Sequence, residues 1–202
     1  MNRELIARTA LRLLDADGID GITMRTLAAE LGVQAATLYW HVKSKEELFR
    51  AMAAIMSEDA AGLMTAADRR APGRECIARW ARALRSTMMS YRDGALVFAG
   101  IHSADPVSFD LIEAVLDAWR DLGLSISEAA QRTALLRDFI VGFCIEAQSL
   151  IELRNESGQG QLEEMKSAAD PARFPLTAQA LPILLSTTAD DHFELGLKLM
   201  LA

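Results

Sequence analysis

Residues 34–45 bring together side chains that contact nucleic acids. The segment reads Gln-Ala-Ala-Thr-Leu-Tyr-Trp-His-Val-Lys-Ser-Lys, so hydroxyl, aromatic, imidazole and ammonium groups follow one another. Groups of this kind bind phosphate oxygens, and a helix that carries them can present further side chains to the edges of bases. The chemistry predicted for this segment is non-covalent recognition of DNA.

Two small groups of acids and histidines could instead bind a metal ion or transfer protons. His102 lies near Asp105, and the pair Asp190-Asp191 precedes His192. Acids in the first turn of a helix stabilise its positive end, which is the simpler explanation of Asp190 and Asp191. The chain has no P-loop and no complete GxGxxG motif. We therefore expect no enzyme activity, no metal and no cofactor.

The charge of the chain is unevenly distributed. Residues 1–50 contain seven basic and seven acidic side chains, whereas residues 51–202 contain 14 basic and 21 acidic ones and hold the whole net charge of −7. An acidic body does not attract nucleic acid without specificity. A DNA contact must therefore come from a local patch in the N-terminal quarter.

The composition is that of a globular protein, with 51% hydrophobic and 24% charged residues among 202. No apolar run approaches the ~20 residues that cross a membrane, and the N-terminus does not resemble a signal peptide. The two cysteines, Cys76 and Cys144, form no CxxC pair. We expect two buried thiols in a cytoplasmic protein.

The elements that must position these side chains are helices. Apolar residues recur at intervals of three and four nearly throughout the chain, and hairpin signals are absent. Loops are predicted over residues 65–74 and 155–176. Helices are predicted from the N-terminus to Gly18 and over residues 23–32, 34–41, 44–56, 75–91, 94–101, 105–122, 127–154 and 189–201, with a further stretch interrupted at Pro182.

Local signals mark several helix ends. Gly18 and Gly32 are suited to left-handed turns, Thr23 is a candidate N-cap, and Ser44 and Glu47 form a candidate capping box. The two short helices on either side of Gly32 predict a helix-turn-helix, whose second helix would read the major groove. An ordinary helical hairpin with its aromatic residues in the core is the alternative.

Two strings in this region are similar to the tetracycline-repressor (TetR) family. Residues 23–33 read Thr-Met-Arg-Thr-Leu-Ala-Ala-Glu-Leu-Gly-Val, and residues 37–45 read Thr-Leu-Tyr-Trp-His-Val-Lys-Ser-Lys. Weaker matches lie at residues 91–94, at the spacing of Phe139, Gly142 and Glu146, and at residues 193–197. The resemblance implies an all-α fold. A three-helix DNA-binding head over residues 1–46 would join a larger helical ligand-binding and dimerisation domain over residues 47–202.

The resemblance also implies a function. It indicates a homodimeric, sequence-specific transcriptional regulator, a repressor that a small-molecule inducer releases from double-stranded operator DNA. Two alternatives stay open at this point. One is a transcriptional activator of the same fold, and the other is a helical structural or interaction dimer without DNA binding.

The DNA-contacting residues that the resemblance implies come from the ends of the two short helices and the turn after them. Arg25 is the candidate for a bidentate contact to guanine, with a phosphate contact as the alternative. The tetracycline-binding relative carries a Gln-Pro pair where this chain has Ala35 and Ala36, so we expect a different operator sequence. The implied set is Thr23, Arg25, Ala35, Thr37, Tyr39, Trp40, His41 and Lys45.

The ligand-contacting residues that the resemblance implies are Trp80, Leu84, Phe98, Val115 and Glu146. Phe98 stands where the tetracycline-binding relative has a metal-ligating histidine. Trp80 and Val115 stand where that relative has an asparagine and a glutamine. These exchanges predict a largely hydrophobic site. Glu146 stands at the site of an acid that the partner subunit supplies in that relative. We expect an apolar or aromatic inducer with a basic nitrogen for Glu146, and no metal–tetracycline complex.

An apolar stripe on the helix over residues 127–154 predicts a four-helix interface with a second copy, together with residues of the last helix. The alternative is that this stripe is the core of a single chain. The residues concerned are Leu136, Phe139, Ile140, Phe143, Ala147, Leu150, Ile151, Phe193, Leu197 and Met200.

Overall fold

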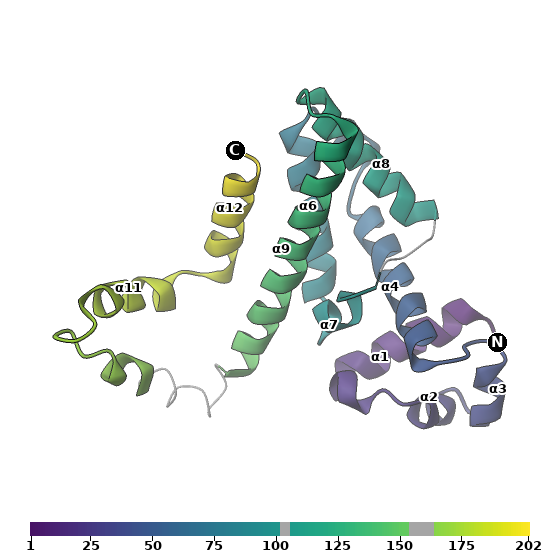
Figure 1. The fold of residues 1–202 in the computed structure, drawn as a ribbon. Helices are drawn as coiled ribbons and strands as arrows, with labels where there is room; N and C mark the ends of the chain where they lie inside the picture. Colours follow the sequence, from purple (N-terminus) through teal and green to yellow (C-terminus); the bar gives the residue numbers. More distant parts are fainter. Residues whose placement is uncertain (102–105, 154–163) are drawn as a thin grey trace. The chain divides into compact units, whose positions relative to one another are not determined.

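A computed structural model describes residues 1–101, 106–153 and 164–202 (Figure 1). These residues are mostly helical and contain no strand, which confirms the all-α prediction. They pack into two compact units, Met1–Ile145 and Glu146–Ala202. Among the described helices, none has both the length and the apolar composition of a membrane span.

The first three helices form a small head. They are α1 (Arg3–Gly21), α2 (Met24–Glu30) and α3 (Ala35–Tyr39), and Figure 1 shows them gathered around one end of α4. Both predicted glycine turns are confirmed, because Gly18 has a φ of 71° and Gly32 a φ of 66°. Glycine adopts such values at little steric cost. The head therefore contains the predicted helix-turn-helix.

Side chains cap the helices at the positions that the sequence indicated. The Thr23 hydroxyl accepts a hydrogen bond from the Thr26 N–H at 3.0 Å, and the Ser44 hydroxyl accepts one from the Glu47 N–H at 3.1 Å. Such bonds satisfy backbone donors that the first helical turn leaves open. One detail of the prediction is wrong, because Glu47 reaches back to the N–H of Lys43 rather than that of Ser44.

The helix α4 (Lys45–Gly62) joins the head to the rest of the first unit. It contacts α1 in the head, and it also contacts α6 (Arg74–Met89), α7 (Gly94–Phe98) and α8 (Pro106–Asp121). The helix α4 thus packs both against the head and against α6, α7 and α8, and one apolar core continues from the head into the rest of the unit. Fully buried members of that core include Leu14, Leu27, Leu38, Leu48, Met52, Met56, Ile77, Met88, Val97 and Val115.

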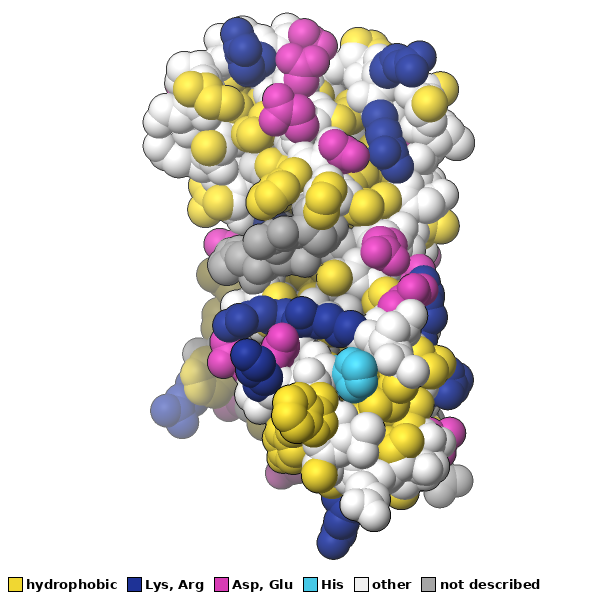
Figure 2. Space-filling view, turned by 90° about the vertical axis from the view of Figure 1, so that its right-hand side faces the viewer, with side chains coloured by type: hydrophobic (Ala, Val, Ile, Leu, Met, Phe, Trp, Pro, Cys, Tyr) yellow, Lys and Arg dark blue, Asp and Glu magenta, His cyan; other side chains and the backbone are white. Residues whose placement is uncertain are grey.

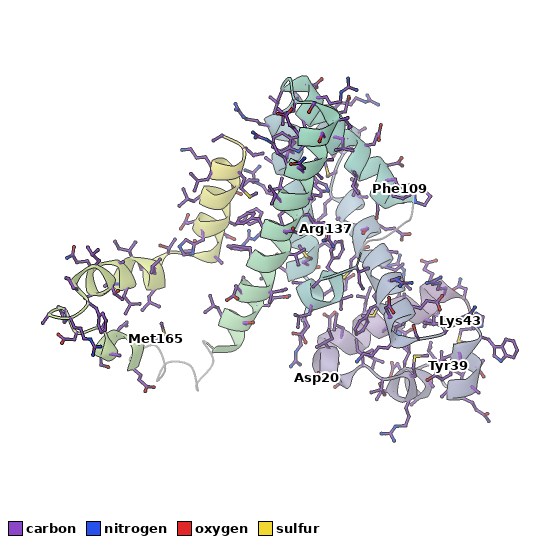
Figure 3. All side chains as sticks on the ribbon, in the orientation of Figure 1. Asp20, Tyr39, Lys43, Phe109, Arg137 and Met165 are labelled. Carbon is purple, nitrogen blue, oxygen red and sulfur yellow. The ribbon has the colours of Figure 1, made fainter. Side chains whose placement is uncertain are left out.

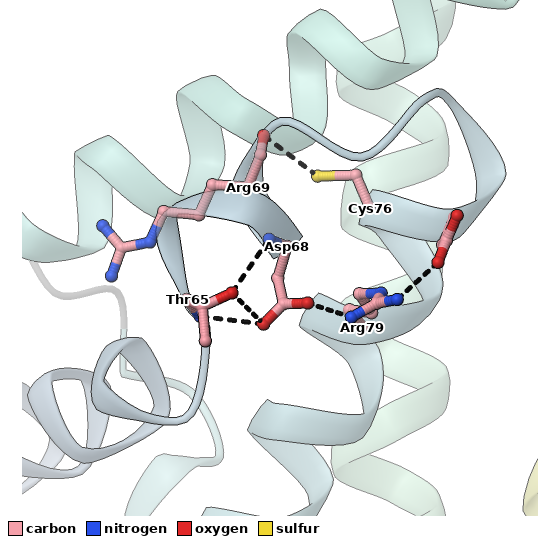
Figure 4. Close-up of polar contacts among 6 residues, drawn as sticks. Thr65, Asp68, Arg69, Cys76 and Arg79 are labelled. Atoms are coloured by element: carbon pink, nitrogen blue, oxygen red, sulfur yellow. Dashed lines mark hydrogen bonds and ion pairs between the residues drawn. The ribbon is translucent and has the colours of Figure 1, made fainter.

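The loop predicted over residues 65–74 contains a short helix, α5 (Ala66–Arg69), so that prediction is wrong in part. Thr65 and Asp68 form a reciprocal capping box, and the carboxylate of Asp68 also pairs with Arg79 of α6 (Figure 4). These bonds lower the pKa of Asp68, most of all the one from the Thr65 hydroxyl. The polar contacts hold this short helix against α6, although it buries no side chain of its own.

The longest helix is α9 (Ile126–Leu153). It begins after Ser125, whose hydroxyl accepts a hydrogen bond from the Glu128 N–H at 3.3 Å while Glu128 accepts one from the Ser125 N–H at 2.9 Å. The predicted start at residue 127 is therefore one residue late. The boundary between the two compact units falls within this helix.

The second unit contains α11 (Pro175–Ser186) and α12 (Ala189–Met200). Two predictions fail here. Residues 164–168 are helical although they fall in the loop predicted over 155–176, of which residues 155–163 lie outside the described residues. In addition, α11 continues through Pro182. Pro182 is exposed, so water can satisfy the carbonyl that loses its helical partner.

Candidate nucleic-acid interface and ligand site

The two aromatic residues of the predicted DNA-reading segment are not core residues. The side chain of Tyr39 is 50% exposed and that of Trp40 is 86% exposed, whereas Leu38 and Val42 are fully buried. Leu38 and Val42 therefore anchor one side of α3 and of the turn after it. The opposite side, which includes Tyr39 in Figure 3, is open to a partner.

The other predicted DNA-contacting residues share this exposure. Thr23, Arg25, Thr37, His41 and Lys45 are exposed, and Ala35 is half-buried. Figure 2 shows, on the side of the molecule where α3 lies, a histidine and several Lys and Arg side chains around exposed apolar atoms. The structure therefore places these residues in the head and, for Lys45, at the start of α4, and it buries none of them completely.

Lys45 stands at the start of α4, close to a small network of charges. Its ammonium lies 5.3 Å from the centre of the Phe49 ring, within the range of a cation–π contact. Arg3 pairs with Glu47 at 3.3 Å and so ties the start of α1 to the start of α4. Glu46 and Glu47 also occupy the first turn of α4. Lys45 thus supplies positive charge beside two acids.

The end of α1 is joined to the turn that precedes α7 by hydrogen bonds between residues far apart in the chain. The Ile19 N–H donates to the Asp93 carboxylate at 2.8 Å, and the Arg92 N–H donates to the Asp15 carboxylate at 2.9 Å. A Cβ on Gly18 would lie 2.9 Å from an oxygen of Asp93. These contacts, which we call the head–body junction, hold the head against the rest of the first unit. Sequence reasoning missed it.

Tyr91 extends the junction to α4. Its hydroxyl donates to the carboxylate of Asp59 at 2.7 Å. Burial and this hydrogen bond raise the pKa of Tyr91 to about 12. The tyrosine therefore remains a neutral donor over the whole physiological pH range.

Four of the predicted ligand-contacting residues are buried in the first unit. Trp80 and Leu84 belong to α6, Phe98 to α7 and Val115 to α8. The helix α6 packs against both α7 and α8. Glu146 is exposed and belongs to the second compact unit. The structure thus brings four apolar members of the set into one core.

Two polar residues near these positions were missed. Arg137 of α9 donates to the carbonyls of Phe98 and Ile101 at 3.2 and 2.7 Å, and its guanidinium lies 5.7 Å from the centre of the Phe98 ring. Burial lowers the pKa of this arginine. Thr87 lies on the face of α6 that carries Trp80 and Leu84, seven and three residues further along the helix. Its buried hydroxyl has no hydrogen-bond partner among the described residues.

The apolar stripe predicted for the dimer interface belongs largely to the core of one chain. Leu136, Ile140, Ala147, Phe193 and Leu197 are all buried without a second copy. Phe139, Phe143 and Met200 are half-buried and Leu150 is exposed, while the side chain of Ile151 lies outside the described residues. These five side chains are covered without a second copy, and their place in the dimer interface stays a prediction.

The candidate metal or acid–base groups have simpler roles where the structure describes them. Thr188 caps α12, and Asp190 and Asp191 stand in its first turn, as the helix-end explanation predicts. His102 and Asp105 lie outside the described residues. Among the described residues, no group of three or more His, Cys, Asp or Glu could hold a metal ion. Cys76 and Cys144 are buried free thiols, and burial raises the pKa of both.

A helix-turn-helix head with an exposed recognition helix (α3), joined to a larger helical domain, is the architecture of a DNA-binding transcriptional regulator. Residues 6–52 match the sequence profile described as "Bacterial regulatory proteins, tetR family". Residues 68–202 match the profile described as "Tetracyclin repressor-like, C-terminal domain". The chain belongs to the TetR family, whose members are regulators and not enzymes.

Individual relatives agree with this assignment over the whole chain. The class C tetracycline repressor of Escherichia coli is 34% identical over 201 residues, which cover 100% of this chain and 89% of the relative. A possible TetR-family regulator from Streptomyces coelicolor A3(2) superposes with a TM-score of 0.85 at 35% identity, covering 99% of this chain and 97% of that chain. ActR from Streptomyces coelicolor, solved in complex with actinorhodin, gives 0.82 at 27% identity, covering 99% and 93%. DNA recognition by residues 23–41 is thereby favoured over an ordinary helical hairpin.

Proposed function

We propose that this chain is a homodimeric repressor that binds operator DNA in the cytoplasm and releases it when an apolar or aromatic inducer binds. Residues 1–46 act as the DNA-binding domain, and residues 47–202 bind the inducer and form the dimer. A ligand that favours a different arrangement of the two heads weakens DNA binding by its differential affinity for the two states.

The main support for DNA binding in this proposal is the exposed surface of α3. Trp40 is 86% exposed, whereas the other two tryptophans, Trp80 and Trp119, are buried. The acidic body leaves the head as the part suited to DNA. We assign the DNA-contacting role to Thr23, Arg25, Ala35, Thr37, Tyr39, Trp40, His41 and Lys45.

Two variants separate reading of bases from binding of phosphates. Replacement of Arg25 by alanine should cost ~1–3 kcal/mol of operator binding and relax the preference at one base pair per half-site. Replacement of Lys45 by alanine should weaken binding to all sequences alike and reduce the salt dependence by about one ion. Binding is measured by fluorescence anisotropy over a range of salt concentrations, on an operator selected from random duplexes.

The matched control is Arg120→Ala, which removes an exposed arginine of α8 outside the head. It should bind the operator as the parent does. If Arg25→Ala and Lys45→Ala also bind like the parent, the head does not contact DNA through these residues.

The inducer class is inferred from the buried residues of α6, α7 and α8. Trp80, Phe98 and Val115 present apolar groups, so an aromatic or aliphatic ligand is favoured over a metal chelate. The relative ActR binds actinorhodin, which supports a ligand of aromatic character. Thr87 offers a hydroxyl to a polar group of the ligand. The contact of Glu146 with a basic nitrogen rests on the family resemblance alone.

Titration with magnesium and tetracycline tests this assignment. We expect the complex of this protein with its operator to persist at micromolar drug, because phenylalanine at position 98 cannot ligate a metal ion. The class C repressor of Escherichia coli serves as the positive control for release. Release of this protein under the same conditions would show that the site accepts the metal–drug complex after all.

A further inference from the structure

Arg137 lies near the middle of α9 and brings a positive charge to the apolar core of the first unit (Figure 3). Its guanidinium lies 5.7 Å from the centre of the buried Phe98 ring, and its side chain is 20% exposed. Both of its hydrogen bonds come from one nitrogen, because Nη2 donates to the carbonyls of Phe98 and Ile101. The N–H groups of Nε and Nη1 make no hydrogen bond within the part of the chain that the structure describes.

The charge of Arg137 has no close counter-ion among the described carboxylates. The carboxylate of Asp138 lies 4.0 Å from Nη1, and its side chain is 73% exposed. An ion pair of this length with one partner in water contributes little. By contrast, the more exposed Arg8 bonds to Glu4 at 2.9 Å. Burial opposes the charged form and lowers the pKa of Arg137. A bound anion would therefore gain free energy at this half-buried cation.

A second polar group of the same core also lacks a partner. Thr87 of α6 is 2% exposed, and its hydroxyl makes no hydrogen bond among the described residues. The helix α6 packs against α7, which carries Phe98. Cores leave few such groups unsatisfied, because each one costs free energy. Two helices, α6 and α9, therefore each leave a polar group of this core with capacity for a ligand.

These polar groups restrict the chemistry of the ligand. A guanidinium has only donors and a permanent positive charge, so its remaining N–H groups bind an anionic acceptor most strongly. The ring of Phe98 and the apolar side chains of Trp80 and Val115 favour an aromatic body. We propose that Arg137 is a ligand-binding residue, which selects aromatic inducers that carry an acidic group such as a carboxylate, a sulfonate or an ionised phenol. This inference rests on the proposed function and adds a negative charge to the ligand inferred there.

Two fluorescent probes with the same ring system test this selectivity on the full-length protein. The first, 8-anilinonaphthalene-1-sulfonate, is an anion, and the second, N-phenyl-1-naphthylamine, is the same molecule without the sulfonate. Both emit strongly in an apolar environment, so titration gives an affinity for each. In Arg137→Gln, affinity for the sulfonate should fall by between about 10-fold and about 150-fold, the range of a hydrogen bond to a charged group, and affinity for the neutral probe by less than about 2-fold.

Two further variants separate the charge from structural effects. Arg137→Lys should recover part of the affinity for the sulfonate that Arg137→Gln loses, because the positive charge remains while the planar set of donors is lost. Arg132→Gln is the matched control, because Arg132 is an exposed arginine of the same helix and also lies over an aromatic ring, 5.5 Å from the centre of that of Trp119. It should change neither affinity. Circular dichroism confirms that each variant is folded.

Unchanged affinity for the sulfonate in Arg137→Gln would overturn the inference. An equal loss for both probes would overturn it as well, because Arg137 would then only hold α7 through its bonds to Phe98 and Ile101. A parent that binds the neutral probe but not the sulfonate would overturn this inference and leave the proposed function intact. Failure of the parent to bind either probe would instead overturn the proposed apolar ligand site as a whole.

Discussion

Three of the buried Ser and Thr side chains in the first unit, Ser57, Thr87 and Thr133, differ in the hydrogen-bond partner of the hydroxyl. Ser57 donates to the carbonyl of Ala53 at 3.0 Å, and Thr133 donates to that of Ala129 at 2.8 Å, each one turn back along its own helix. Thr87 makes no such bond among the described residues. A buried polar group without a partner costs about 1–3 kcal/mol of folding free energy. This cost is the reason to connect Thr87 with a ligand.

Replacement of Thr87 by valine, which has nearly the same shape, tests that reasoning. Without ligand, the free energy of unfolding should stay the same or rise by up to about 1–3 kcal/mol, because an unpaired hydroxyl is removed. Thr133→Val is the matched control and should lower the free energy by about 0.5–1.5 kcal/mol, because it removes a formed hydrogen bond. Urea titration measures both. Equal destabilisation by the two variants would show that the Thr87 hydroxyl is already bonded in the free protein.

At the scale of the helix, the head–body junction depends on the absence of a side chain at residue 18. Gly18 is buried with a φ of 71°, and a Cβ there would lie 2.9 Å from Asp93. Asp93 itself has a φ of 55°, a value uncommon for a residue other than glycine. Both residues therefore adopt left-handed backbone geometry in order to bring the Ile19 N–H to the Asp93 carboxylate.

We expect Gly18→Ala to weaken the junction through two effects, backbone strain and a clash with Asp93. Gly123→Ala is the matched control for strain alone, because Gly123 has a φ of 87° and nothing within 4 Å of its Cβ position. Strain at positive φ costs of order 1–3 kcal/mol, and Gly18→Ala should lower the free energy of unfolding by more than the control. Hydrogen exchange of the Ile19 amide should also accelerate in Gly18→Ala. If both variants lose the same stability, the contact with Asp93 contributes nothing.

The helix ends show which structural features can be predicted from the sequence alone. Thr23, Ser44, Gly18 and Gly32 were predicted correctly as caps or turns, because each acts on backbone within a few residues of itself. The helix α5 was missed because it buries no side chain and so has no apolar period, although Thr65 and Asp68 do form a recognisable capping box.

What depends on packing could not be predicted from one sequence. The bond from Ile19 to Asp93 joins residues 74 positions apart, and no local pattern marks either partner. Leu136 and Phe193 have the same apolar character whether they face their own chain or a second copy, so the pattern could not separate core from interface. Most residues of the predicted DNA-contacting set are exposed, as the family motif implies. The roles of the predicted DNA-contacting and ligand-contacting residues stay predictions.

At the scale of the whole molecule, each compact unit leaves apolar side chains uncovered. Leu135 of α9 is 60% exposed, and Leu195 and Leu199 of α12 are 55% and 68% exposed. Large apolar side chains spaced four apart on one helix form a stripe that favours contact with another helix. We propose that these exposed residues take part in the dimer interface.

Light scattering at micromolar concentration should give about twice the chain mass of 22.1 kDa. Replacement of Leu199 by glutamate should shift the protein toward the monomer, because a charge would enter the apolar interface. Leu63→Glu, at an exposed leucine just after α4, is the control and should remain dimeric. A parent that scatters as a 22 kDa species would contradict the dimer. A dimeric Leu199→Glu would place the interface elsewhere.

The distribution of the three tryptophans has an optical consequence. Trp40 lies in water at the end of the reading helix, while Trp80 and Trp119 are buried. A polar environment shifts indole emission to longer wavelength, so the red edge of the fluorescence spectrum comes mainly from Trp40 and a soluble quencher such as acrylamide reaches that residue first. Operator DNA covering α3 would shield the red component, and an inducer beside Trp80 would alter the blue one. The unlabelled protein thus reports its two binding events in separate parts of one spectrum.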